Sequence, residues 1–334
     1  MRTFTFLGPD TVSVVVAMNG SQQMADGTNI GTWYFREGTG LGFNGDRTIP
    51  SPVIELTEGQ NAAITLTSNR PHSIHLHGLD VNQANDGVPT TSGYVATSVP
   101  MDGFGRVQGY TRLNSPFTYA FVAPQAGSYM YHCHIDTALH MERGMAGMII
   151  VRPPDGNTEE VWAGGPTFDK EYIWHLHTID SSWHTVQVSD TTLNRYRPDY
   201  FLINGKNGSQ IDTDPATAIT AAAGDRVLIR AINVGYQPAL VKFGGLSFDV
   251  VSSDGRPLAS TLTALTELWV TSGERYDIIL TMPAATDVTA SVEYWNVRMA
   301  AILGTATAPV VEDPTLFADG FESGDTTRWS NSVE

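Results

Sequence analysis

Intramolecular disulfide bonds are excluded, because the 334-residue chain contains a single cysteine, Cys133. Basic residues are also few: 19 Lys and Arg stand against 35 Asp and Glu, which gives a net charge of −16. This acidity argues against nucleic acid and anionic membranes as partners. No apolar run approaches the roughly 18 residues that predict a transmembrane helix. The sequence after Met1 also lacks a signal-peptide core, so the protein is intracellular or has lost a leader.

Helical patterns are scarce, whereas turn residues are frequent. The chain has 32 glycines and 18 prolines, and they separate short β-branched runs such as Thr11–Val16 and Ala63–Thr67. Many short strands with frequent turns favour a β-sandwich. Arg152–Asn157 is the clearest linker, and the sequence after it partly repeats the sequence before it. We therefore predict an all-β chain with two sandwich domains, residues 1–153 and 158–310, and an acidic tail at 311–334.

All nine histidines fall in three stretches, at residues 72–77, 132–140 and 175–184. Side chains alternate between the two faces of a strand, so residues an even number apart share a face. If the first two stretches are neighbouring strands, this alternation sorts their side chains into two groups. One group is His72 and Cys133, and it is joined by His140 and Met145 from the loop that follows. The other is a set of four imidazoles on one face, namely His75, His77, His132 and His134.

The two groups indicate copper chemistry. Two His, one Cys and a weak axial Met are the ligands of a copper electron-transfer site. Four converging neutral imidazoles would be costly to bury without a metal, and they suit a copper cluster. Cys133 is bonded through the main chain to His132 and His134, so an electron received at the thiolate has a through-bond route to the second group.

These motifs resemble those of the multicopper oxidases, the laccases and their relatives. The matching residues are His-x-x-His-x-His-Gly at 72–78, His-Cys-His-Ile at 132–135 and His-x-x-x-Gly-Met at 140–145. The segment Asp136–Met141 looks like that of two-domain bacterial laccases whose blue copper lies in domain 1. The resemblance covers roughly residues 50–310 and implies two cupredoxin-like Greek-key β-sandwich domains.

The resemblance also implies a role for each residue. It makes His72, Cys133, His140 and Met145 the type 1 ligands, His75 a type 2 ligand, and His77, His132 and His134 type 3 ligands. The predicted catalytic residues are Cys133 and His140, together with Asp86, which matches the acidic residue that assists proton delivery. A turn-forming role for Asp86 before Gly87 is the open alternative.

The second domain is where the sequence departs from the family. A full cluster in the family uses eight histidines, and the first domain supplies four of them. In the two-domain relatives the others come from domain 2 of a neighbouring subunit in a homotrimer. The usual positions here hold Val241 and Phe243, so the predicted ligands become His175, His177 and His184. The ligand count then reaches seven, which leaves the cluster one ligand short.

The expected function is a laccase-like oxidase with about four copper ions per subunit, in type 1, type 2 and binuclear type 3 sites. It would oxidise phenolic or aromatic donors, or metal ions, and reduce dioxygen to water in the periplasm or outside the cell. One alternative is a copper nitrite reductase, which would leave His75 and His134 as surplus ligands. Another is a copper carrier or blue electron-transfer protein with about one copper per chain.

Overall fold

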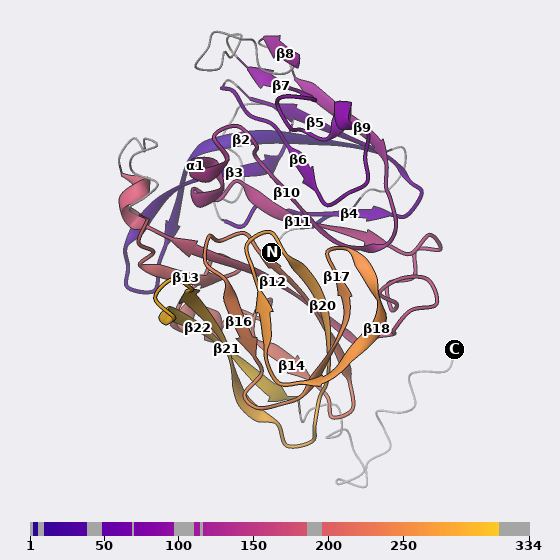
Figure 1. Cartoon of the computed structure of the whole chain (residues 1–334), viewed down its shortest axis with the longest axis vertical. Helices are drawn as coiled ribbons and strands as arrows, with labels where there is room; N and C mark the ends of the chain where they lie inside the picture. Colours follow the sequence, from indigo (N-terminus) through magenta and orange to yellow (C-terminus); the bar gives the residue numbers. More distant parts are fainter. Residues whose placement is uncertain are drawn as a thin grey trace, which may run out of the picture.

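The chain folds into two β units that lie one above the other in Figure 1. The computed structural model describes residues 3–5, 10–38, 49–68, 70–96, 110–113, 116–185 and 196–313. The predicted acidic tail lies outside the described residues from residue 314 onward. None of the described helices is long and apolar enough to cross a membrane.

The first unit is a sandwich of two sheets. In spatial order, one sheet contains β1 (Thr3–Thr5), β4 (Val53–Thr57), β11 (Ala146–Arg152), β10 (Gly127–His132) and β6 (His75–His77). The other contains β3 (Asn29–Glu37), β2 (Asp10–Gln23), β5 (Asn61–Thr67) and β9 (Phe117–Val122). A separate pair joins β7 (Gly93–Ala96) to β8 (Tyr110–Leu113), and two short helices are η1 (Gln83–Asn85) and α1 (Thr137–Glu142).

The core of the first unit follows from strand alternation. Along β5, buried residues alternate with partly exposed ones, so Ile64 and Leu66 face the opposite sheet. They pack in one cluster with Ile54 and Ile149 of that sheet. Cys133 belongs to the same cluster, so its thiol lies between the two sheets rather than at the surface.

The second unit has the same two-layer plan. One sheet contains β13 (Tyr200–Ile203), β12 (Lys170–Ile179), β15 (Arg226–Asn233), β20 (Arg275–Thr281), β17 (Phe248–Ser253) and β18 (Arg256–Leu265). The other contains β14 (Ile219–Ala221), β22 (Ala301–Glu312), β21 (Asp287–Asn296), β16 (Ala239–Lys242) and β19 (Leu268–Val270). Its short helices are η2 (Ser181–His184) and α3 (Ser209–Asp212). Val241 and Phe243 are fully buried in this core, so these positions present no side chain to solvent.

The two units are joined by an apolar contact and a buried ion network. Met148 and Ile150 of β11 pack against Ile232 of β15. Beside them, the Arg152 guanidinium donates two hydrogen bonds to Glu171, at 2.8 and 2.7 Å. Arg230, which is fully buried, donates to the same carboxylate at 2.5 Å. This arrangement fixes the face of β12 that carries the domain 2 histidines against the first unit.

The predicted all-β, two-sandwich architecture is confirmed. The predicted linker at Arg152–Asn157 begins at the last residue of β11 and lies before β12. The strand expected to carry His132, Cys133 and His134 is shorter than the alternation argument assumed, because β10 stops at His132. Beyond His132 the main chain bonds to loops: the Cys133 N–H donates to the Met145 carbonyl at 3.1 Å, and the His134 N–H donates to the Ser73 hydroxyl at 3.1 Å.

Candidate metal centre

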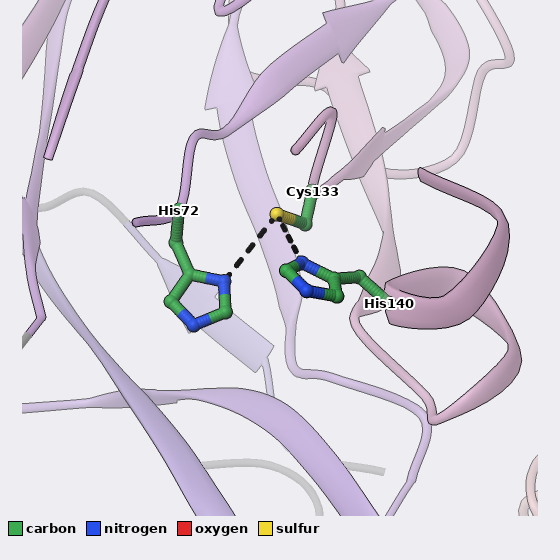
Figure 2. Close-up of side chains that lie close together, drawn as sticks. All are labelled: His72, Cys133 and His140. Carbon is green, nitrogen blue, oxygen red and sulfur yellow. Dashed lines mark hydrogen bonds between the residues drawn. The ribbon is translucent and has the colours of Figure 1, made fainter. Parts of the chain in front are cut away.

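The first candidate site is built around the Cys133 thiol (Figure 2). The sulfur lies 3.1 Å from Nδ1 of His140 and 3.5 Å from Nδ1 of His72. All three side chains are buried, and one ligand atom of each lies within 4.8 Å of the others. Metal–nitrogen and metal–sulfur bonds of about 2.0–2.3 Å place two ligands of a shared ion roughly 3.5 Å apart. The spacing therefore fits one metal ion among the three.

Local structure brings these residues together from separate segments. Cys133 follows β10, and His72 precedes β6, its neighbour in the sheet. Asp136 adopts a left-handed conformation (φ 44°) that turns the chain into α1, which carries His140. Met145 follows α1 and is fully buried in the same core cluster as Cys133. The predicted His-Cys-His group with a neighbouring Met is thus assembled in space.

The environment of this site favours uncharged histidines. Burial lowers the pKa of His72 well below its usual value, and the charge on a protonated His140 would lower it further. Burial and the nearby Arg143 lower the pKa of His140 to about 4. Neutral imidazole is the form that binds metals. Burial also raises the pKa of Cys133 to about 12, so the thiol keeps its proton until a metal displaces it.

The second candidate site is the four-histidine group on the other face of the same strands. β6 and β10 pair antiparallel with His75 opposite His132, and this register brings the imidazoles together. The ring centroid of His75 lies 5.4 Å from that of His77, 5.0 Å from that of His132 and 5.2 Å from that of His134. His77 Nδ1 and His132 Nε2 are 3.2 Å apart. The predicted grouping of these four residues is therefore present in the structure.

Backbone carbonyls orient two of these rings. Nδ1 of His75 lies 2.8 Å from the Asp86 carbonyl and 3.2 Å from the Asp86 carboxylate. Nδ1 of His132 lies 3.0 Å from the Cys133 carbonyl. If each Nδ1 carries the proton and donates it to its carbonyl, each Nε2 is free to bind a metal. Burial lowers the pKa of His132 to about 3, which keeps this ring neutral in the absence of a metal.

The three domain 2 histidines lie elsewhere and are covered by their own chain. His175, His177 and His184 are only 3%, 2% and 8% exposed. Both ring nitrogens of His175 are buried and have no hydrogen-bond partner. Burial lowers the pKa of His177 well below its usual value. None of the three belongs to either group of converging ligand atoms.

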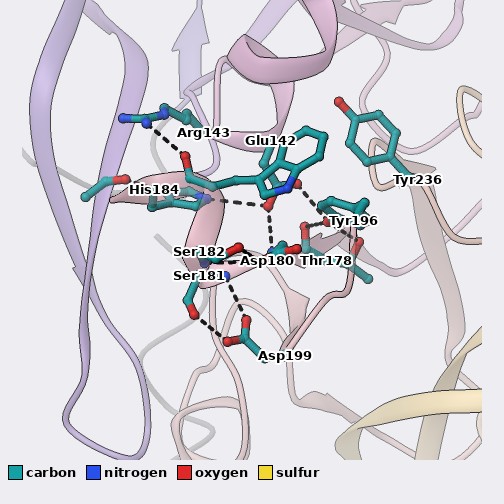
Figure 3. Close-up of polar contacts among 12 residues, drawn as sticks. Glu142, Arg143, Thr178, Asp180, Ser181, Ser182, His184, Tyr196, Asp199 and Tyr236 are labelled. Carbon is teal, nitrogen blue, oxygen red and sulfur yellow. Dashed lines mark hydrogen bonds and ion pairs between the residues drawn. The ribbon is translucent and has the colours of Figure 1, made fainter. Parts of the chain in front are cut away.

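His184 takes part in a polar network between α1 and the second unit (Figure 3). Its Nδ1 lies 2.6 Å from the Gly31 carbonyl, and its Nε2 lies 3.5 Å from the Glu142 carboxylate. The same carboxylate accepts hydrogen bonds from the Asp180 N–H and the Tyr196 hydroxyl, each at 2.7 Å. Burial raises the pKa of Glu142, against the lowering effect of these donors. His184 therefore has partners from the first unit of its own chain.

This burial bears on the expected role of the domain 2 histidines in a neighbouring subunit. A ring nitrogen that is enclosed by its own chain cannot bond a metal ion held by another subunit without a rearrangement. In this conformation the ring nitrogens of His175 and His184 lie inside their own chain, and their donation to a neighbouring subunit stays a prediction. Their assignment as metal ligands within the chain stays a prediction, as does that of His177.

Sequence reasoning missed three residues beside the candidate sites. Trp33 meets His140 edge-on with ring centroids 5.2 Å apart. Arg275 of the second unit packs closely on Gly78, just after His77. A Cβ added to Gly78 would lie only 2.1 Å from Nη2 of Arg275, so the contact leaves no room for a side chain there. Glu142 is the third. Only Glu142 had a signal in the sequence, because it is a charged residue two positions after His140, in a segment expected to pack close to the site.

Comparison with known proteins identifies the family. A family model described as multicopper oxidase matches residues 13–155, and a second of the same description matches residues 174–312. Together they match well over half of the chain, so the protein belongs to the multicopper oxidase family, as its motifs predicted.

Individual relatives are distant and longer. Laccase-15 of Oryza sativa subsp. japonica is 29% identical over 252 residues, which are 71% of this chain and 38% of the relative. The copper-containing nitrite reductase of Neisseria gonorrhoeae is 26% identical over 241 residues, which are 69% of this chain and 50% of the relative. The chain thus spans half or less of their length.

A solved structure supports the fold. The blue copper oxidase from Nitrosomonas europaea has a TM-score of 0.69 and 23% identity, with 93% of this chain and 86% of that chain covered. At this identity the likeness shows the fold alone. The predicted cupredoxin-like β-sandwich fold is confirmed.

Proposed function

We propose that this protein is a laccase-like copper oxidoreductase that oxidises small reducing donors one electron at a time and reduces dioxygen. The observation that carries the proposal is the convergence of His72 and His140 on Cys133, with ring nitrogens 3.5 and 3.1 Å from its sulfur. Cys133 is also flanked in sequence by two histidines of the second site. Membership of the multicopper oxidase family supports a function for both sites, because such enzymes use several copper ions.

Each site has a distinct task in the proposed reaction. His72, Cys133 and His140, with Met145 as the axial residue, would hold the copper that takes up electrons, and the histidine group would hold the copper that reacts with oxygen. Copper supplies a metal centre that gains and loses single electrons at both sites. Burial of the Cys133 thiol keeps water from the sulfur, and the neutral rings of His72 and His140 leave their nitrogen lone pairs available.

The balance of the proposed reaction is four single-electron oxidations for each dioxygen molecule. Each phenolic donor would lose one electron and one proton, and oxygen would take four electrons and four protons to give two water molecules. Asp86 lies beside His75, with its carboxylate 3.2 Å from Nδ1. This position suits a group that passes protons to the oxygen-reducing site. Phenolic or aromatic compounds and metal ions are the proposed donor classes.

The nitrite reductase alternative has one observation in its favour. Only three of the four imidazoles, those of His75, His77 and His132, have ligand atoms that converge within 4.8 Å. A copper site with three histidines needs fewer ligands than a copper cluster, as the alternative requires, and one relative is named as a copper-containing nitrite reductase. A homotrimer and a periplasmic or secreted location stay predictions from the resemblance.

Two assays on one preparation test the proposal. Oxygen consumption with a phenolic donor should proceed and should stop when copper is chelated. Nitrite with a reduced donor should give little turnover. Rapid nitrite reduction without oxygen uptake would reject the laccase-like function in favour of the alternative. Absence of both activities in a fully copper-loaded protein would reject both functions.

A further inference from the structure

The spacing of the imidazole nitrogens fits one metal ion in the histidine group. His77 Nδ1 and His132 Nε2 lie 3.2 Å apart. Two nitrogens bound at about 2.0–2.1 Å to one tetrahedral ion are expected roughly 3.3 Å apart. His75 supplies a third ligand atom within 4.8 Å of these two. Because Nδ1 of His75 is directed at Asp86, its Nε2 is the nitrogen available to that ion.

His134 stands outside this triad. Its ring stacks on that of His132 with centroids 5.8 Å apart and meets His75 at 5.2 Å. None of its ring nitrogens joins the converging set. His134 is also only partly buried, whereas His132 is 4% exposed. One flanking neighbour of Cys133 therefore points into the triad, and the other lies at its margin.

The second unit offers no histidine to a larger cluster. All nine histidines of the sequence lie within the described residues, and six of them are in the two sites of the first unit. The remaining three are enclosed between the units, and ring nitrogens of His175 and His184 are buried there. A second copy of the chain in this conformation would present the same covered histidines. Neither arrangement supplies nitrogen ligands for two further metal ions.

A positive charge lies on the side of the triad that faces the second unit. The Arg275 side chain is 5% exposed and is held by the Gly273 carbonyl at 2.7 Å and the Asp254 carboxylate at 3.0 Å. Gly273 itself approaches His77, since a Cβ built on it would lie 3.5 Å from that ring. A fixed guanidinium at this position repels further cations placed beside His77.

We infer that the histidine group binds a single copper ion through His75, His77 and His132, so that each chain holds about two copper ions in total. The inference rests on the proposed function only in taking copper as the metal. It replaces a three-copper cluster at this group by a mononuclear site. It also assigns different tasks to the two histidines that flank Cys133, with His132 as a ligand and His134 as a neighbour.

The primary test is the copper content of the intact, fully loaded protein, measured together with its native mass. After loosely bound metal is removed, elemental analysis should give about two copper ions per chain. Electron paramagnetic resonance of the oxidised protein should detect all of this copper, as two separate signals. A content of one copper, of three or more, or a large fraction of copper without a signal, would overturn the inference.

A matched pair of variants tests the triad itself. His132→Gln should lose about one copper per chain and keep the blue colour of the Cys133 site, whereas His134→Gln should keep both ions. Loss of a copper ion from His134→Gln, or full retention by His132→Gln, would contradict the assignment. The result is separable from the proposed function: four copper ions with oxygen uptake would leave the function standing, and two copper ions without uptake would reject the function alone.

Discussion

The two sets of histidines in this chain are arranged for different purposes. Five of the six histidines of the first unit, all except His134, have a ring nitrogen within 4.8 Å of other ligand atoms, in two groups on opposite faces of the β6 and β10 segments. Those of the second unit are also buried, but their nitrogens do not converge. His184 instead has the Gly31 carbonyl and the Glu142 carboxylate as partners. A His-x-His pattern on a strand therefore does not by itself define a metal site.

The difference lies in what faces each strand. β6 is the last strand of its sheet, and the four imidazoles share a face that is only partly covered. β12 is an interior strand, and its histidine-bearing face is packed against the first unit. Alternation along a strand decides which side chains share a face, but tertiary packing decides whether that face is open to a metal or filled by neighbours.

The largest effect is expected from Cys133→Ser. A hydroxyl is a poor substitute for a thiolate as a copper ligand, so the intense blue absorption should vanish. Turnover of a phenolic donor should fall by more than the roughly 100-fold that changes outside the ligand set produce. Visible absorption and oxygen uptake measure the two effects. His177→Gln is the matched control, because His177 belongs to neither group of converging ligand atoms and its loss should leave the blue band unchanged. A blue, active Cys133→Ser variant would reject the site.

Much of this contrast could be predicted from the sequence, but not all of it. Strand alternation correctly separated Cys133 from His132 and His134, even though β10 ends at His132. The same rule placed His175 and His177 on one face, with ring centroids 6.2 Å apart in the structure. It could not show that this face is buried against the first unit, because that depends on residues distant in sequence. Glu142 and Arg275 were missed for the same reason.

Glu142→Ala should destabilise the contact between α1 and the second unit without removing a metal ligand. The substitution leaves the buried Asp180 N–H without its acceptor, whereas the Tyr196 hydroxyl can still donate to the Thr178 carbonyl at 3.0 Å. The loss should cost about 2 kcal/mol in free energy of unfolding. Urea unfolding of the metal-free protein measures the loss. Tyr196→Phe is the milder control and should cost about 1 kcal/mol. If Glu142→Ala were as stable as the parent, the network around His184 would not be a structural contact.

Acid should weaken the ion network of Arg152, Glu171 and Arg230 between the two units, which holds the domain 2 histidines in place. Burial raises the pKa of Glu171, but Arg230 and Arg152 outweigh it and hold this pKa at about 2, below the ordinary 4.5. Because the pKa of the Glu171 carboxylate is lowered in the folded state, this carboxylate stabilises the fold above pH 4.5. Its contribution is lost as the pH falls towards 2. The loss should approach about 3 kcal/mol. Thermal unfolding between pH 5 and pH 2.5 should show it, and Glu171→Gln should have a flatter profile. Identical profiles would mean that the ion network does not link the units.

The smallest effect is expected from Asp86→Asn, which tests the histidine group without touching a predicted ligand. The Asp86 carbonyl, 2.8 Å from His75 Nδ1, is kept in the variant, so His75 should stay oriented and the copper content should not change. The carboxylate at 3.2 Å is lost, and with it the proposed source of protons for oxygen reduction. Oxygen uptake should fall about 10-fold, and the blue copper should accumulate in its reduced, colourless form during turnover. Asp80→Asn is the control, because Asp80 pairs with Arg256 rather than with a histidine. A lower copper content in Asp86→Asn would mean that the carboxylate positions His75, and a normal rate would mean that Asp86 only forms the turn before Gly87.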